Sequence, residues 1–431
     1  MRQQLRSAIS GLIVVGAMTT VAAQTPSVVL TLKEAERMAT AQHPLIRASQ
    51  YAALAADESV RETRAAYFPT ALGSFTGAGA LDGTRIAAGG LNNPIILDRF
   101  AAGVGVSQLV TDFGRTSDLV ASARYVAEAR EKDVDVRRAD VLLQVDRAYF
   151  DVLREQAVLK VAQQAVDARK LIVDQIEALA QSQLKSGLDV SFARVNLSEA
   201  QLLLVQARND LDASFAGLSA ATGSTQRTKY ELVDEALPAA PEDDGNALVA
   251  RALRERPDVS AQRLADQASA KFAEAERSLA LPSISFVGAA GFTPYHQIGL
   301  TDRYSAAGVN VIVPLSNGNL FAARRAEAAF RAQGQTQALH DLENRVARDV
   351  MVAWLDARTA FQRLDLTAEL LVQASAALEL ATARYNLGLS SIVELTQAQL
   401  NHTRAEIEQA TSQYQYQIKS ATLRYQTGEL R

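Results

Sequence analysis

The chain has 431 residues, 48% of them hydrophobic and 21% charged, so it can bury a core and has the composition of a folded protein. Its formal net charge is −4, which excludes the basic excess that binding to nucleic acid requires. It has no cysteine, which excludes disulfides, thiolate metal sites, a cysteine nucleophile and a lipid-bearing cysteine.

The first residues have the pattern of a secretory signal peptide. Arg2 and Arg6 precede an apolar stretch over 8–21, and small residues follow it. This order predicts removal of residues 1–23 and a mature chain that begins at Gln24. The alternative, an uncleaved membrane anchor, is disfavoured because the apolar stretch is short. No later stretch has 18 uninterrupted apolar residues, so we expect no membrane-spanning helix in the mature chain.

The remainder of the chain contains one unit twice. Four short motifs of the first half have a counterpart about half the chain later. The matched positions are Pro44 with Pro257, Pro69 with Pro282, Ala101 with Ala306, and Gly187-Leu188 with Gly388-Leu389. Internal similarity of this kind indicates a duplicated structural unit. We therefore predict a first repeat over 24–245 and a second over 246–431, joined by a Pro-, Gly- and acid-rich segment over 223–246 that is ordered against the body.

Both repeats have the same predicted order of elements: helices, two strands and a long helical hairpin. In the first repeat these are helices over 31–42 and 44–66, strand segments that begin at Thr70 and Arg99, a helix from 115 to about 185, and a helix from about 190 to 222. In the second they are a helix over 257–280, strand segments that begin at Leu281 and Arg303, and helices from about 320 to 387 and from 389 to about 425. Pro44 and Pro257 start helices, because proline suits the first helical turn and disfavours helix in the residue before it.

The two longest helices exceed the length of helices in globular domains. At 1.5 Å per residue, the roughly 70 residues of the first would extend about 105 Å. Such lengths are typical of coiled coils and helical arrays. In each repeat two shorter helices together nearly equal the long one, so we expect them to stack end to end beside it. A seven-residue repeat that predicts a coiled-coil seam runs through Val393, Leu400, Ile407, Tyr414 and Ala421.

A Gly-Leu pair follows each long helix. We predict that Gly187 and Gly388 end these helices as C-caps with positive φ, which glycine adopts without steric cost. The predicted caps of the returning helices are Asp189 and either Ser390 or Ser391, and Ser391 with Glu394 fits a capping box.

The strand segments alternate between apolar and small or polar residues. In the second repeat the apolar positions are Ile284, Phe286, Gly288, Ala290 and Phe292, then Val309, Val311 and Val313. Period-two alternation predicts strands between lipid and water, and the alternative is a soluble antiparallel sheet. An open sheet cannot stand in lipid, because its edges carry unpaired backbone groups. The sheet must therefore close by adding subunits; a dimer gives eight strands, which side chains fill, whereas a trimer gives twelve and leaves a duct.

In their order and spacing, several segments resemble the TolC-like outer-membrane efflux family, the outer-membrane factors of tripartite pumps. These segments are LTLKEAERMATAQHPLIRAS, AAYFPTALGSF, GVSQLVTDFGR, SGLDVSFARVNLSEAQLLLVQARNDL and ARYNLGLSSIVELTQAQL. The resemblance implies a mainly α protein with membrane β structure: a homotrimer whose four strands per protomer form a 12-stranded barrel that continues into a long periplasmic α-helical barrel. It implies an outer-membrane exit duct for efflux or type I secretion. The implied partners are a periplasmic adaptor (membrane-fusion) protein, an inner-membrane RND or ABC transporter, and outer-membrane lipid.

The resemblance also assigns roles at the periplasmic tips, where the family closes its duct and docks its adaptor. The implied docking turns are Lys185, Ser186, Gly187 and Leu188 in the first repeat and Leu387, Gly388, Leu389 and Ser390 in the second. Acids that line the closed mouth in the family match Glu394 and Gln397, so this duct would have one acidic ring instead of two. The positions of the family's interlocking acid and basic latch hold Ala193 and Ser390 here, and Asp189 and Arg194 would substitute for them. The alternative for Glu394 is a helix cap only.

The sequence favours neither an enzyme nor a cofactor-binding protein. The four histidines, His43, His296, His340 and His402, have no metal-binding spacing, and we expect no metal site. Glycine-rich phosphate loops and nucleophile elbows are absent from the sequence. The competing class is a periplasmic coiled-coil structural or binding protein without a barrel, which would leave the four strand segments unexplained. The residues do not indicate a cargo.

Overall fold

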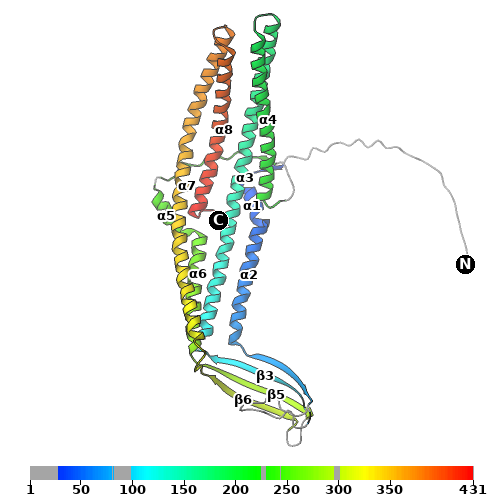
Figure 1. The fold of residues 1–431 in the computed structure, drawn as a ribbon, viewed down its shortest axis with the longest axis vertical. Coiled ribbons are helices and arrows are strands. Elements are labelled where there is room, and N and C mark those ends of the chain that lie inside the picture. Colours follow the sequence, from blue (N-terminus) through cyan, green and yellow to red (C-terminus); the bar gives the residue numbers. More distant parts are fainter. Residues whose placement is uncertain are drawn as a thin grey trace, which may run out of the picture.

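The computed structural model describes residues 28–79, 81, 99–224, 230–242, 244–295 and 301–430. The predicted signal peptide over 1–23 lies outside these residues. The molecule is elongated, and its helices run along its length (Figure 1). A small sheet forms one end, and the turns of two helical hairpins form the other. Of the helices that the structure describes, none is both long and apolar enough to cross a membrane.

The first half of the chain follows the predicted order. Helix α1 (Leu32–Gln42) begins with a capping box between Thr31 and Glu34. His43 caps α2 (Pro44–Arg64), because its Nδ1 accepts a hydrogen bond from the backbone N–H of Leu45 at 3.3 Å. The remaining elements are the 3₁₀ turn η1 (Ala65–Tyr67), β2 (Thr70–Ala78), β3 (Arg99–Thr111), α3 (Arg115–Gln181) and α4 (Gly187–Ala221).

The second half repeats this plan. Its elements are α5 (Gly245–Glu255), α6 (Pro257–Arg277), the 3₁₀ turn η2 (Ser278–Ala280), β5 (Ser283–Tyr295), β6 (Arg303–Ile312), α7 (Leu320–Asn386) and α8 (Ile392–Thr427). The long helices α3 and α7 have 67 residues each, which corresponds to about 100 Å. Helices α2 and α4 follow one another along α3, and α6 and α8 follow one another along α7 (Figure 1). The predicted end-to-end stacking is therefore confirmed.

The predicted heptad seam on α8 is wrong in its register. Val393 is 55% exposed, and of the five predicted positions only Ala421 is buried. The buried positions of α8 include Ile392, Leu395, Gln399, Ala405, Ser412 and Tyr416. The difference arises because α8 packs against α3 as well as α7, so the buried stripe faces the space between two helices.

A collar of short segments fastens the middle of the helices. Strand β1 (Val28–Leu30) pairs in parallel with β4 (Tyr230–Leu232), a pairing that the sequence did not predict. The Tyr149 hydroxyl of α3 donates to the carbonyls of Leu30 and Val233, at 3.0 and 2.6 Å. The indole N–H of Trp354 donates to the carbonyl of Glu242 at 2.7 Å. Residues 230–242 of the connecting segment are thus ordered against the body, as predicted.

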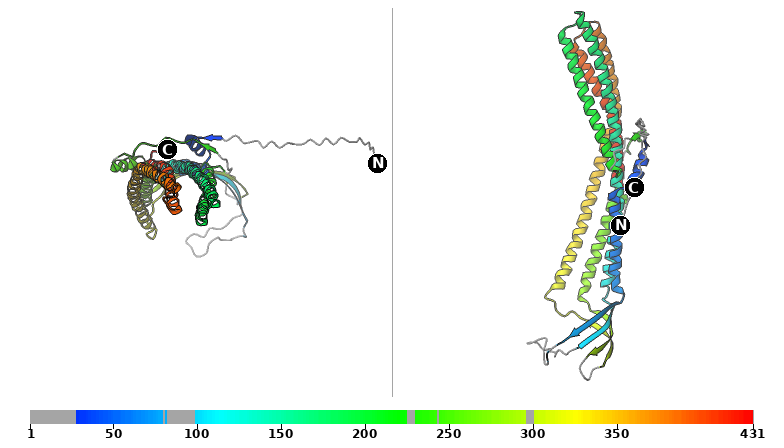
Figure 2. Two further views of the ribbon diagram at one scale, coloured as in Figure 1. Left: turned by 90° about the horizontal axis from the view of Figure 1, so that it is seen from above. Right: turned by 90° about the vertical axis from the view of Figure 1, so that its right-hand side faces the viewer.

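The main hydrophobic core lies beneath this collar, where α1, α2, α3 and α4 meet. Its largest fully buried members include Tyr149, Ile46 and Leu218. Viewed along the long axis, the helices form an arc rather than a closed bundle (Figure 2). The single chain therefore presents a concave and a convex face along its helices.

The four strands form one antiparallel sheet in the order β2-β3-β5-β6. Phe286 is opposite Val309 and Ile284 is opposite Val311, so the two predicted apolar stripes share one face. Phe75, Val104, Phe286, Phe292, Val309 and Val311 lie on this face, and all of them are exposed. The other face carries mainly small and polar residues, including Ser74, Gly103, Ser285 and Gly308. Strands β2 and β6 are edges in the single chain, so the sheet is open.

Candidate functional site: the tips of the two helical hairpins

The two hairpins turn in different ways, which corrects one prediction. After α7, Gly388 adopts a φ of +74°, and the N–H of Leu389 donates to the carbonyl of Arg384 at 2.8 Å, as predicted for a C-cap glycine. After α3, the left-handed residue is Gln183, with a φ of +60°. Gly187 is instead the first residue of α4, so the prediction that Gly187 ends α3 is wrong.

The returning helices are capped by serines. The Ser186 hydroxyl accepts from the N–H of Asp189, and the Asp189 carboxylate accepts from the N–H of Ser186 at 3.0 Å, which completes a capping box. Ser391 accepts from the N–H of Glu394 at 3.4 Å. The Glu394 carboxylate does not return to Ser391 and instead pairs with Arg384 of α7 at 3.3 Å. The box predicted at Ser391 is therefore only half formed.

The four predicted lumen residues form no common cluster within one chain. Asp189 is held by its own cap, and Arg194 pairs with Glu177 of α3 at 2.8 Å, not with Asp189. The Gln397 amide donates to Asn401 at 3.0 Å, one turn further along α8. Each of these side chains, like Glu394, has a partner within its own hairpin.

The sequence did not predict how the two tips contact each other. The ammonium group of Lys185 lies 3.8 Å from the centre of the Tyr385 ring, so the turn after α3 covers the end of α7. Below this contact, a small core joins both hairpins through Val173, Ile176, Ala193, Tyr385, Ile392 and Leu395. Burial raises the pKa of the Tyr385 hydroxyl, and the Asp189 carboxylate raises it further. Ala193, which the resemblance placed at the position of the family's interlocking acid, is buried in this core, where an unpaired charge would be costly.

Exposed leucines occupy the extreme end of the molecule. Leu184 and Leu188 flank the first turn, and Leu387 and Leu389 flank Gly388 in the second. Their exposed fractions are 71%, 66%, 74% and 67%. Exposed apolar side chains clustered at one extremity of a protein are typical of a protein interaction site.

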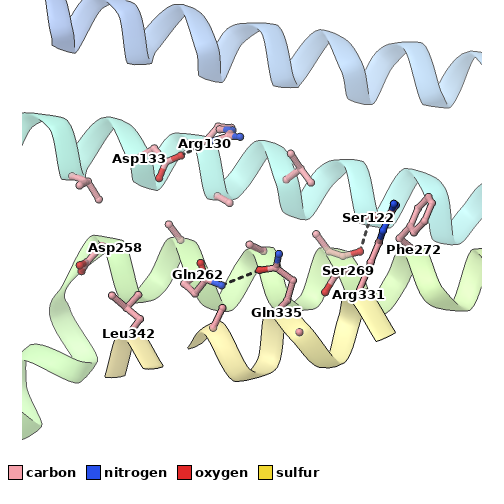
Figure 3. A pocket seen from close by; sticks show the side chains of 18 of the residues that line it. Ser122, Arg130, Asp133, Asp258, Gln262, Ser269, Phe272, Arg331, Gln335 and Leu342 are labelled. Carbon is pink, nitrogen blue, oxygen red and sulfur yellow. Dashed lines mark hydrogen bonds and ion pairs between the residues drawn. The ribbon is translucent and has the colours of Figure 1, made fainter. Parts of the chain in front are cut away.

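Another cavity of the described structure has polar side chains that pair with one another. A cavity of about 800 Å³ lies between α3, α6 and α7 (Figure 3). Its Arg130 pairs with Asp133 at 2.9 Å, and its Gln262 donates to Gln335 at 3.0 Å. In the part of the chain that the structure describes, no three His, Asp or Glu side chains are grouped as metal ligands. His296 lies outside that part.

Comparisons with known proteins agree with this architecture. The family model described as Outer membrane efflux protein matches residues 37–224 and 248–429, on either side of the connecting segment. Outer membrane protein TolC of Escherichia coli (strain K12) is 21% identical over 412 residues, covering 93% of this chain and 82% of that protein. Outer membrane efflux protein BepC of Brucella suis is 28% identical over 193 residues, covering 44% of this chain and 40% of that protein.

Solved structures share the fold. The outer-membrane channel OprN superposes with a TM-score of 0.81 at 18% identity, covering 92% of this chain and 89% of that one. The open-state MtrE outer membrane channel of Neisseria gonorrhoeae superposes with a TM-score of 0.77 at 18% identity, covering 93% and 89%. Because the family model matches most of the chain, the protein belongs to the outer membrane efflux protein family and is a TolC-like protein of the outer membrane with a helical extension into the periplasm.

Proposed function

We propose that the chain is one third of a trimeric exit duct that passes substrates from an inner-membrane transporter, of the RND or ABC class, and a periplasmic adaptor to the exterior. The observation that carries this proposal is the open sheet, which has one exposed apolar face and two unpaired edges and is attached to helices of 67 residues. The names of the relatives support efflux, and type I secretion would use the same duct.

Closure of the sheet is the reason for proposing a trimer. In lipid, each unpaired backbone group at an edge would cost several kcal/mol. Pairing β6 of one protomer with β2 of the next satisfies both edges, and three copies of the four-stranded sheet give twelve strands. The apolar face would then contact lipid, and the small, polar face would line the pore. A periplasmic coiled-coil protein without a barrel would leave this exposed apolar face without a partner.

The helices supply the periplasmic part of the duct. Three arcs such as the one in Figure 2 would close into a tube that continues the barrel. The tube would end at the hairpin tips, where the exposed leucines at positions 184, 188, 387 and 389 offer an apolar surface to the adaptor. Ser186, Gly187, Gly388 and Ser390 belong to the same two turns.

A bilayer experiment tests the duct and its gate together. Purified protein should be a trimer in detergent and should form cation-preferring pores in planar bilayers, because threefold symmetry would gather three Glu394 carboxylates near one axis.

Glu394→Gln should reduce both the cation preference of the pore and its block by divalent ions. Arg384→Gln, which frees the carboxylate from its ion pair, should increase both. A soluble monomer would refute the duct. Unchanged selectivity in both variants would leave Glu394 as the ion-pair partner of Arg384 and nothing more.

Valine substitutions at two glycines distinguish adaptor docking by the turns from an effect on the backbone conformation of the turns. Gly388→Val places a branched residue at a φ of +74°, whereas Gly187→Val places it in helical backbone, and a Cβ at either site meets nothing within 4 Å. We expect the first to cost about 1 kcal/mol locally and the second less. If the turns dock an adaptor, both variants should lower efflux and adaptor co-purification at normal trimer levels. If only Gly388→Val did so, backbone strain and not docking would be the cause.

A further inference from the structure

The helical wall contains a buried cation without a counter-ion. Arg169 of α3 is 5% exposed, and in the described part of the chain it forms no ion pair. Its one hydrogen bond is from Nη1 to the carbonyl of Asn196 on α4, at 2.9 Å. Burial lowers the pKa of this guanidinium, and the acid that opposes the shift is Glu199, which is exposed. Buried guanidinium groups are normally paired, so the missing partner needs an explanation.

A cavity lies directly beside this side chain. It has a volume of about 390 Å³ and separates the α3–α4 hairpin from the α7–α8 hairpin. Helix α3 contributes Arg169 and Ile172, α7 contributes Thr382, and α8 contributes Gln399 and His402, among others. Arg169 lines this cavity, and none of its nitrogens is both fully enclosed and without a hydrogen-bond partner, so its unused N–H groups are open to solvent. One wall of the cavity therefore presents hydrogen-bond donors that carry a positive charge.

The neighbours of Arg169 hold it in place. The Asn196 side chain donates to Gln399 of α8 at 3.0 Å, and both residues are buried. This contact links the two hairpins at the floor of the cavity. Across the cavity, the carboxylate of Glu406 lies 3.4 Å from Nδ1 of His402. Glu406 therefore has a partner on its own helix, and the structure shows no ion pair between it and Arg169.

We infer that this cavity binds a small carboxylate, which would bridge the two hairpins by accepting hydrogen bonds from Arg169. A planar carboxylate matches the fork of the guanidinium better than a spherical anion does. The hydroxyls and amides of Thr382, Thr403, Gln164 and Gln399 line the remainder and suit a second polar group on the ligand. Because the ligand would contact α3 and α8 together, it would oppose their separation.

The test uses the full-length protein in detergent, with succinate as the probe and chloride at equal ionic strength as the reference. Succinate should raise the apparent melting temperature saturably, by about 5 °C, and calorimetry should show one site per chain. Arg169→Leu should abolish both effects. Arg208→Leu is the matched control, since Arg208 is exposed on α4 and does not line the cavity, and it should retain both.

A second variant keeps the proposal testable if Arg169→Leu does not fold. Arg169→Lys keeps the charge but loses the fork, so the dissociation constant for succinate should rise about tenfold. Acetate should bind more weakly than succinate, because it lacks the second polar group. The proposal is overturned if succinate shows no saturable binding to the wild type, or if Arg169→Lys binds it as tightly as the wild type does.

Discussion

Gly291→Val should remove the trimer from the outer membrane. Gly291 of β5 is paired with Gly103 of β3 and Tyr304 of β6. A Cβ at position 291 would lie 2.4 Å from the backbone oxygen of Ala102 and 2.5 Å from the hydroxyl oxygen of Tyr304. The backbone oxygen cannot move without breaking the sheet, so we expect overpacking of about 3 kcal/mol or more in every protomer. The sheet would then fail to present the regular edges that closure requires.

Two further variants separate this cause from a general loss of stability. Gly308→Val changes a glycine on the same face of the neighbouring strand, where a Cβ meets nothing within 4 Å, and should assemble normally. Gly291→Val combined with Tyr304→Ala removes the side-chain clash but not the clash with Ala102, so it should not restore the trimer. Semi-native gels of outer-membrane fractions measure the result. A wild-type amount of trimer in Gly291→Val would show that the sheet does not have this packing.

Stability of the collar region should fall as the pH rises from about 4 to about 7. Asp146 of α3 is 1% exposed, and neither carboxylate oxygen has a hydrogen-bond partner in the described structure. Burial, and then the nearby carboxylate of Glu36 on α1, raise the pKa of Asp146 to about 7, while Arg424 on α8 lowers it. An ionised Asp146 carboxylate can only accept hydrogen bonds, whereas the protonated form can also donate one. The other charged groups near Glu36 are Lys33, Arg37 and Glu429.

The sign of this effect follows from proton linkage. An aspartate in the unfolded chain has a pKa of about 3.9, so between pH 4 and 7 the folded state binds more protons than the unfolded state. The contribution of Asp146 is neutral below pH 4, and its destabilisation is complete above pH 7, where it amounts to about 4 kcal/mol.

Three variants test this linkage. Asp146→Asn should flatten the pH dependence of the melting temperature and should be more stable than the wild type at pH 8. Glu36→Gln should reduce the slope. Asp151→Asn, on the same helix but partly exposed and paired with Arg154, should leave the slope unchanged. A wild-type melting temperature that is constant from pH 5 to 8 would contradict the raised pKa of Asp146.

The sequence by itself determined the elements and their order. Pro44 and Pro257 start α2 and α6 because their conformational restriction acts within one or two residues. The alternation from Ile284 to Phe292 predicts the apolar face of β5 for a similar reason, since side chains in a strand alternate regardless of its partners. Helix lengths and the end-to-end stacking follow from the spacing of the breaks.

The conformation of the tips, the pairing in the collar and the buried face of α8 were decided only by the tertiary structure. The sequence predicts Gly187 as the left-handed residue after α3, but in the structure Gln183 adopts this conformation, and the same turn packs over Tyr385. The pairing of β1 with β4 joins three-residue strands about 200 residues apart, too short to carry a pattern. Val393 continues a heptad in the sequence, yet it is exposed because α8 contacts α3 as well as α7. These features depend on contacts between segments that are far apart in the sequence, so no single segment predicts them.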